Sequence, residues 1–496
     1  MAKKNLITFL LIVSCAVIVF IIGCWPTDTL QWSADGSVGI YSKAGALYIV
    51  DGNSGSIRQV APKETTTRWP GISPDGSQFA YGKIVKVDDF NRDFKLLPAD
   101  QVKVIKAHAE ILKQKVLIEG IKDSNFPFVG KPVATNGGQK DSFNEQHIAW
   151  VQRYLVENAD TGLAGKIGAE LVNKTKSKDL AYCQLVCVPT ADPNNQKILV
   201  TSQMWLWRIR FSPDCRLIAY GAERFNGRPW DVGYDLYVVS RAESIPPVLV
   251  APAAAIGYDF KPDSRAIAYI KPQDEFFDDP TTLGSLVERT VIDPNGRLLA
   301  SLDPNDPSQK YTCTGAASEL VGVLYHPWMH VSYTHENRIF FASAKMSLPS
   351  SKLDEEEQTI FCCDLLTYAV SDITPNNTPE VWRGNLYLFA LSGDSRKILV
   401  PGQKNTLLLY ALGPDLNLSR VIVDANESFG DDAPEKKLVA QWKGPDRFSC
   451  LVWEKSHFLT QDPNTPHRRK EIVIIGTDGN LKQILSKDWP DELLDF

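Results

Sequence analysis

The chain has 496 residues, of which 44% are hydrophobic and 23% charged, values typical of globular proteins rather than of disordered chains. Its length exceeds what one ordinary hydrophobic core supports, so we expect two domains or one repeat architecture. The formal net charge is −6 and the sequence contains no basic block, which argues against nucleic acid as a partner.

The first 24 residues differ from the rest of the chain. Lys3 and Lys4 precede an uncharged stretch, 6–23, whose length lies between that of a signal-peptide core and that of a full membrane span. The stretch ends at Ile21-Ile22-Gly23-Cys24, which resembles the bacterial lipoprotein box. The resemblance implies acylation of Cys24, and the alternative is a retained single-pass helix. Both hypotheses place residues 25–496 in a bacterial cell envelope, outside the cytoplasm and anchored to a membrane.

A turn motif recurs along the chain, at 32–36, 72–76, 211–215, 260–264 and 391–395. In the copy Ser73-Pro74-Asp75-Gly76, proline presets φ, the aspartate bonds back to the backbone, and glycine supplies a positive φ. An apolar strand precedes each turn and another follows it. Because the aspartate recurs in every clear copy, we interpret it as a turn former without catalytic function: the five are Asp35, Asp75, Asp214, Asp263 and Asp394.

Two further strands follow the motif in each repeat, such as 47–50 and the segment after the turn at 51–53. Four antiparallel strands make one propeller blade, and a single blade cannot bury both of its faces alone. These residues resemble the TolB-type (WD40-like) β-propeller repeat over about 30–85 and 181–485. The resemblance implies an all-β propeller and an extracytoplasmic location.

The spacing of the motifs predicts seven blades, with six and eight as the alternatives. We place them at about 30–62, 68–202, 205–251, 256–302, 320–376, 385–426 and 437–487.

The second of these blades contains a segment, 86–178, that breaks the strand pattern. Its apolar residues follow helical spacing, which predicts three helices around 102–116, 148–155 and 163–171. Ser142-Phe143-Asn144-Glu145 predicts a capping box at the start of the second. The segment is therefore an α-helical insertion, which either docks a partner or covers the edge of a blade.

The search for chemistry finds weak candidates. His326, His330 and His335 lie within ten residues, but His330 and His335 are five apart, which on a strand puts them on opposite faces. This spacing matches no metal-ligand motif, so we predict no metal site. The sequence contains no Gly-x-Ser-x-Gly elbow, phosphate loop or dinucleotide fingerprint, and we predict neither an enzyme nor a cofactor.

The sequence thus favours a non-enzymatic, membrane-anchored envelope propeller that binds another envelope protein. The alternative is a site for a small molecule or glycan, possible catalysis included, in the central funnel. The feature that separates the two hypotheses is the convergence of polar and ionisable side chains on the propeller axis.

Overall fold

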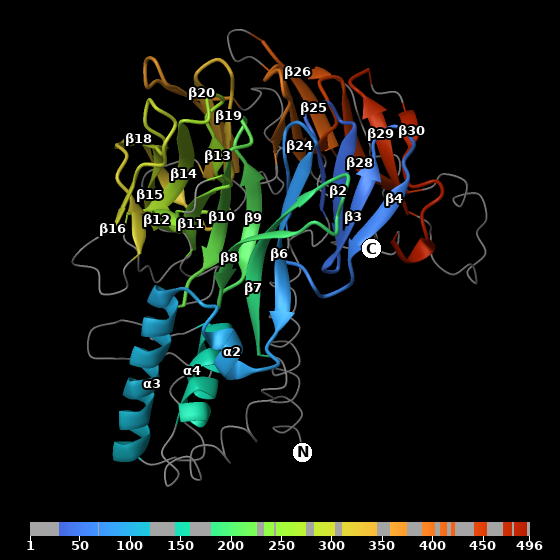
Figure 1. The fold of residues 1–496 in the computed structure, drawn as a ribbon. Helices are drawn as coiled ribbons and strands as arrows, with labels where there is room; N and C mark the ends of the chain where they lie inside the picture. Colours follow the sequence, from blue (N-terminus) through green and yellow to red (C-terminus); the bar gives the residue numbers. More distant parts are fainter. Residues whose placement is uncertain are drawn as a thin grey trace, which may run out of the picture.

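A computed structural model of the chain (Figure 1) describes residues 29–67, 69–119, 144–158, 180–225, 233–242, 245–273, 282–302, 310–344, 358–373, 389–401, 407–413, 418–421, 441–453, 470–478 and 481–493. The leader 1–24, with Cys24, lies outside these residues. Within them, no helix combines the length and the apolar character needed to cross a membrane.

Seven sheets form a β-propeller, and each blade has four antiparallel strands that follow one another along the chain except in the fourth, where a hairpin precedes the last strand. The first three contain β1 (Thr29–Trp32), β2 (Val38–Lys43), β3 (Ala46–Asp51) and β4 (Ile57–Ala61); β5 (Gly71–Ile72), β6 (Gln78–Lys86), β7 (Ala181–Pro189) and β8 (Lys197–Ser202); and β9 (Leu206–Phe211), β10 (Leu217–Glu223), β11 (Tyr234–Ser240) and β12 (Val248–Ala254).

The other four sheets contain β13 (Asp259–Phe260), β14 (Ala266–Pro272), β15 (Thr282–Thr290) and β18 (Ala317–Tyr325); β19 (Val331–Tyr333), β20 (Arg338–Ala344), β21 (Gln358–Asp364) and β22 (Val370–Asp372); β23 (Ala390–Leu391), β24 (Lys397–Pro401), β25 (Leu407–Leu412) and β26 (Leu418–Val421); and β27 (Gln441–Trp442), β28 (Arg447–Trp453), β29 (Lys470–Gly476) and β30 (Leu481–Ile484). A short 3-10 helix, Asp491–Leu493, follows the last sheet.

The predicted number of blades, seven, is confirmed, but the limits of the fourth and fifth are wrong. The fourth blade takes its outer strand from β18, inside the range predicted for the fifth. Residues predicted to end the fourth blade form a hairpin instead, made of β16 (Ala300–Leu302) and β17 (Tyr311–Cys313). This hairpin extends the third sheet, because β17 pairs in parallel with the outer edge of β12. An open sheet edge readily accepts such an added strand.

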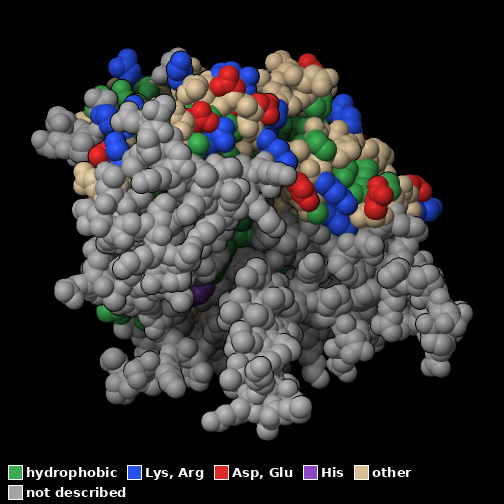
Figure 2. Space-filling view, turned by 90° about the horizontal axis from the view of Figure 1, so that it is seen from below, with side chains coloured by type: hydrophobic (Ala, Val, Ile, Leu, Met, Phe, Trp, Pro, Cys, Tyr) green, Lys and Arg blue, Asp and Glu red, His purple; other side chains and the backbone are tan. Residues whose placement is uncertain are grey.

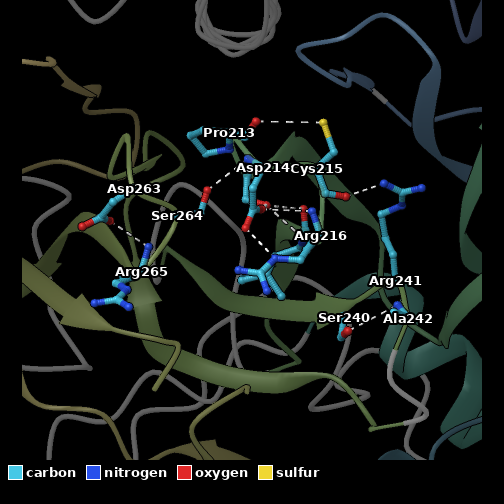
Figure 3. Close-up of polar contacts among 12 residues, drawn as sticks. Pro213, Asp214, Cys215, Arg216, Ser240, Arg241, Ala242, Asp263, Ser264 and Arg265 are labelled. Atoms are coloured by element: carbon cyan, nitrogen blue, oxygen red, sulfur yellow. Dashed lines mark hydrogen bonds and ion pairs between the residues drawn. The ribbon is translucent and has the colours of Figure 1, made fainter. Parts of the chain in front are cut away.

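The recurring turns join the first and second strands of the blades. In the copy around Asp75, the carboxylate accepts hydrogen bonds from Ser73 Oγ (2.6 Å) and Ser77 N (3.0 Å). The bond from Ser73 holds the pKa of Asp75 below its ordinary value, so the carboxylate stays ionised at neutral pH. Asp35, Asp214 and Asp394 accept the equivalent serine and backbone bonds, whereas Asp263 accepts the backbone bond alone among those described. Figure 3 shows Asp214 and Asp263 in this position.

Neighbouring turns contact one another. Ala34 N donates to Pro74 O (2.8 Å), and Asp214 N donates to Ser264 Oγ (3.0 Å), so turns of adjacent blades are bonded together at one face of the propeller. From this face β6 runs to Lys86, where the helical insertion begins. The insertion therefore leaves the propeller at the opposite face, as Figure 1 shows.

The blades pack face to face through apolar clusters, each shared by two neighbours. The cluster between the third and fourth blades, for example, joins Leu236 and Val238 to Ile267 and Tyr269. The first strands of neighbouring blades also lie side by side, as with β5 and β9, β13 and β19, or β1 and β27. The first strand of each blade is therefore the innermost, and these strands surround the axis.

The ring closes between the first and seventh blades without a shared strand. Trp489 packs on the Tyr41 ring (5.2 Å between centroids) and donates from Nε1 to Gly55 O (2.7 Å). Tyr41 Oη donates to Leu493 O (3.1 Å). Residues that follow the last sheet thus contact the first blade, next to the strands of the seventh blade against which the first blade packs.

Among the described residues between β6 and β7, three helices pack against the propeller: α2 (Phe90–Phe94), α3 (Ala99–Glu119) and α4 (Glu145–Asn158). Most of the apolar residues with helical spacing are buried there: Ile105, Ala109, Leu112, Val151 and Leu155. Trp150 is buried with them, and its Nε1 donates to Ala181 O (3.0 Å). The capping-box prediction is wrong in register: α4 begins at Glu145, and its N-cap is Asn144, whose Oδ1 accepts from Gln146 N (2.9 Å). The predicted helix at 163–171 lies outside the described residues.

We predict that Asp214→Ala lowers the free energy of unfolding more than Asp263→Ala does, by about 2 against about 1 kcal/mol. Asp214 accepts from Ser212 Oγ (2.6 Å) and Arg216 N (3.1 Å) and pairs with Arg216 Nε (2.6 Å), whereas Asp263 accepts only from Arg265 N (2.9 Å) among the described residues. Urea unfolding followed by circular dichroism measures both losses. Equal losses would contradict this account of the turns.

Candidate functional site at the propeller axis

The ends of four innermost strands meet at the face that carries the helical insertion. Each innermost strand begins at this face, because it runs from there to the recurring turns. Ile209 N in β9 donates to Trp69 O just before β5 (2.9 Å). A Cβ on Gly257, before β13, would collide with the Met329 carbonyl and the His330 Cα, before β19. Side chains from the second to the fifth blades therefore gather around one point of the axis.

Aromatic rings line one side of the space around this point of the axis. We call this space the axial recess and these rings its aromatic wall. Trp69 lies edge-on to Trp207 (6.2 Å between centroids) and to Trp328 (6.3 Å), and Tyr234 lies 5.9 Å from Trp328. Ile256 packs in the same cluster. Trp207 and Trp328 are only partly buried, so solvent reaches the recess. Figure 2, seen from the helical side, shows a hollow with hydrophobic side chains and a histidine inside it.

Arg208 places a positive charge in the recess. Its Nη2 lies 2.5 Å from His330 Nδ1, and its Cζ lies 6.0 Å from the centre of the Trp69 ring. Its Nε is buried and has no hydrogen-bond partner among the residues that the structure describes. No carboxylate pairs with Arg208 among the described residues. Burial, with a contribution from nearby Arg210, lowers the pKa of Arg208 to about 9, so the guanidinium remains charged at neutral pH.

Arg210, two residues further along β9, is already neutralised. Its Nη2 forms an ion pair with Asp259 Oδ1 (3.2 Å), and its Nη1 donates to Tyr258 O (3.1 Å). The second carboxylate oxygen of Asp259 accepts from Tyr333 N (3.0 Å). The two arginines therefore differ: Arg210 has a counter-ion, and Arg208 has none in the described part of the chain.

The backbone at Arg208 is unusual as well. Its φ is +45°, in the left-handed region that non-glycine residues rarely adopt. The pairing of β9 with β10 shifts register between Ala219 and Gly221, so that Arg208 and Ile209 form a β-bulge in β9 opposite Tyr220. Bulges re-aim side chains, and strained backbone is concentrated at functional sites. Trp69, with φ +62°, shares this strain.

The histidines predicted as weak metal candidates do not converge. His330 lies in the recess, where burial and the charges of Arg208 and Arg210 hold its pKa well below 6.5, so the ring is neutral. Burial lowers the pKa of His326 to about 4, and its Nδ1 accepts from Trp328 N (3.3 Å). His335 is exposed in the turn after β19, at the opposite face. In the described ranges, no three His, Cys, Asp or Glu side chains could hold a metal.

A buried hydrogen-bond chain joins the helical insertion to the aromatic wall. Glu223 accepts from Trp207 Nε1 (2.8 Å) and from Asn144 Nδ2 (2.9 Å), and Asn144 is the N-cap of α4. Burial raises the pKa of Glu223 to about 7, against the opposing effect of these two bonds. Next to it, His147 lies 3.1 Å from Gln203 Oε1 and 2.7 Å from the ring of His108. The insertion is thus built into the propeller at the rim of the recess.

The charged residues of the recess were missed at the level of sequence. The signal that could have found them is the segment Trp205–Phe211, where Arg208 and Arg210 occupy an innermost strand that is otherwise apolar. Such a strand faces the axis, so a charge on it needs either a partner or a function.

No family model and no curated protein sequence matches the chain. Solved structures resemble it in fold. Hydrazine synthase from Kuenenia stuttgartiensis is 11% identical (TM-score 0.40; 78% of this chain, 76% of that one). Oligogalacturonate lyase from Vibrio parahaemolyticus is 10% identical (TM-score 0.41; 79% of each chain). A TolB structure from Agrobacterium tumefaciens is 12% identical (TM-score 0.34; 59% of this chain, 84% of that one). Each similarity concerns the fold alone.

The two arginines should respond in opposite ways to removal of their charge. We predict that Arg208→Gln leaves the free energy of unfolding unchanged or raises it by about 1 kcal/mol, because it removes a buried charge without a counter-ion. Arg210→Gln should lower it by about 2 kcal/mol, because Asp259 then loses its partner. Urea unfolding of both variants measures the difference, and an equal loss in the two would contradict the assignment of Arg208 as unpaired.

Proposed function

We propose that this chain is a membrane-anchored propeller of the bacterial cell envelope that binds a small anionic molecule in the axial recess. The observation that carries the proposal is the half-buried Arg208, whose buried Nε has no hydrogen-bond partner and whose guanidinium has no counter-ion among the described residues and lies against the Trp69 ring. A buried charge of this kind is costly unless something compensates it, and an apolar pocket with one such group is typical of ligand sites. This proposal follows the alternative hypothesis drawn from the sequence.

The proposal is for binding without catalysis. The ionisable groups around the recess already make hydrogen bonds or ion pairs that hold them in place. Asp259 is bonded to Arg210 and Tyr333, Glu223 accepts from two donors, and neutral His330 directs Nδ1 at Arg208. These contacts suit groups that position Arg208 and the aromatic wall, rather than a free acid or base that exchanges protons with a substrate.

Anchorage to the envelope rests on the leader. A positively charged start, an uncharged stretch and the Ile21-Ile22-Gly23-Cys24 box support a lipoprotein, with a retained helix as the alternative. We predict that Cys24→Ala blocks cleavage and removes labelling by a fatty-acid analogue in a bacterial host. The wild type and a Cys15→Ala control should both be labelled. Normal cleavage of the Cys24 variant would exclude the lipoprotein, whereas a wild type that is neither cleaved nor labelled would leave the single-pass helix.

We also propose that the chain binds another protein of the cell envelope, as the sequence led us to expect. The observation that favours this second proposal is the exposed apolar surface of the insertion. Helix α3 extends away from the propeller in Figure 1, and its Ile111 is 48% exposed. Leu96, which precedes α3 in the sequence, is 50% exposed. A partner would then contact the outer side of the helical insertion, and the axial recess would serve the small molecule.

Iodide, an anionic quencher of tryptophan fluorescence, tests the binding proposal directly. Trp69, Trp207 and Trp328 line the recess, so an anion attracted by Arg208 quenches them by contact. We expect Arg208→Gln to lower the quenching constant for iodide but not that for neutral acrylamide. Arg396→Gln, which removes an exposed charge at the turn face, is the matched control and should change neither. Equal iodide quenching in wild type and Arg208→Gln would contradict the proposal.

A further inference from the structure

The charges that face the axial recess sum to one positive charge. Arg208 and Arg210 contribute two, and Asp259 removes one through its ion pair with Arg210. His330 is neutral because its pKa lies well below 6.5. Behind the aromatic wall, Glu223 adds partial negative charge at neutral pH, since its pKa is about 7. Arg208 therefore leaves one positive charge in the recess, which compensates a single negative charge on a ligand.

The donors of Arg208 favour a planar acceptor with two oxygens. His330 Nδ1 engages Nη2, which has two hydrogens, and Nε has no partner. Nη1 makes no hydrogen bond to any described residue. A guanidinium with donors left over in one plane matches the two oxygens of a carboxylate, which it binds with parallel hydrogen bonds.

The aromatic wall favours a flat group beside that carboxylate. Trp207 and Trp328 both stand edge-on to Trp69, at interplanar angles of 68° and 86°. Both rings are partly exposed, so a ligand can pack against them. Aromatic faces bind other flat rings, and they bind the apolar faces of sugar rings in the same way.

We propose that the axial recess binds a monocarboxylate carried on a six-membered ring with an apolar face, with its carboxylate on Arg208 and its ring against the partly exposed Trp207 and Trp328. The inference rests on the proposed function and narrows it to one ligand class. The ring can come from an aromatic acid or from a sugar acid, and these two sources share the chemistry that the recess offers.

Isothermal titration calorimetry of the full chain in detergent tests the class. Benzoate and glucuronate are the two monocarboxylate probes, benzyl alcohol and glucose are their neutral counterparts, and inorganic phosphate is the competing anion. We expect at least one monocarboxylate to bind with a Kd at least tenfold lower than that of its neutral counterpart and that of phosphate. Arg208→Gln should raise that Kd at least tenfold, and Arg396→Gln should leave it unchanged. Which of the two acids binds identifies the source.

Other outcomes overturn the inference separately from the proposed function. Tighter binding of phosphate, or equal binding of the neutral compounds, would exclude the monocarboxylate. Failure of all five probes, with iodide quenching still dependent on Arg208, would exclude the ring-borne carboxylate while the anion site stands. If neither measurement depends on Arg208, both proposals fail. Because Arg208→Gln is expected to fold at least as stably as wild type, loss of binding in this variant reports on the site.

Discussion

The apolar contact between neighbouring blades is the constraint on which the rest of the molecule depends. A four-stranded sheet buries neither of its faces alone, so each blade needs a neighbour on both sides. Every described blade meets this need. Between the sixth and seventh blades, for example, Leu399 and Leu409 pack against Phe448 and Cys450. Once all faces are satisfied in a ring, the innermost strands necessarily surround an axis, and the shape of the axial recess follows from the packing of the blades.

The axial recess departs from the rules that the blades obey. Around it, Arg208 and Trp69 adopt positive φ, β9 bulges, and the half-buried Arg208 guanidinium has no counter-ion among the described residues. Each of these features is unfavourable by itself, and the surrounding packing tolerates them together. The chain Trp207–Glu223–Asn144 also attaches the helical insertion at this point. Local strain, uncompensated charge and an added subdomain coincide at one end of the axis, while the turn face at the other end is regular.

The sequence predicted what local chemistry determines. The Ser-Pro-Asp-Gly turns revealed the blades because serine, aspartate and glycine act within five residues, and Cys215, Ser264 and Ser395 adopt the same positive φ where glycine has been replaced. Helical spacing located α3 and α4 for the same reason. The recess could not be predicted, because Arg208 meets His330 from 122 residues away. That contact depends on which strand ends come together across blades. The hairpin of β16 and β17 was missed likewise, since its partner β12 belongs to another repeat.

The closure of the ring has a consequence for the order in which the chain matures. The first blade is joined to the seventh by side chains from the last part of the chain, Trp489 and Leu493 among the contacts with Tyr41. A chain that is synthesised from its N-terminus presents the bare apolar face of the first blade until those residues arrive. During that interval the exposed face is a target for chaperones and proteases. A chain cut short by a premature stop codon would never cover it, and such fragments would be removed by cellular quality control.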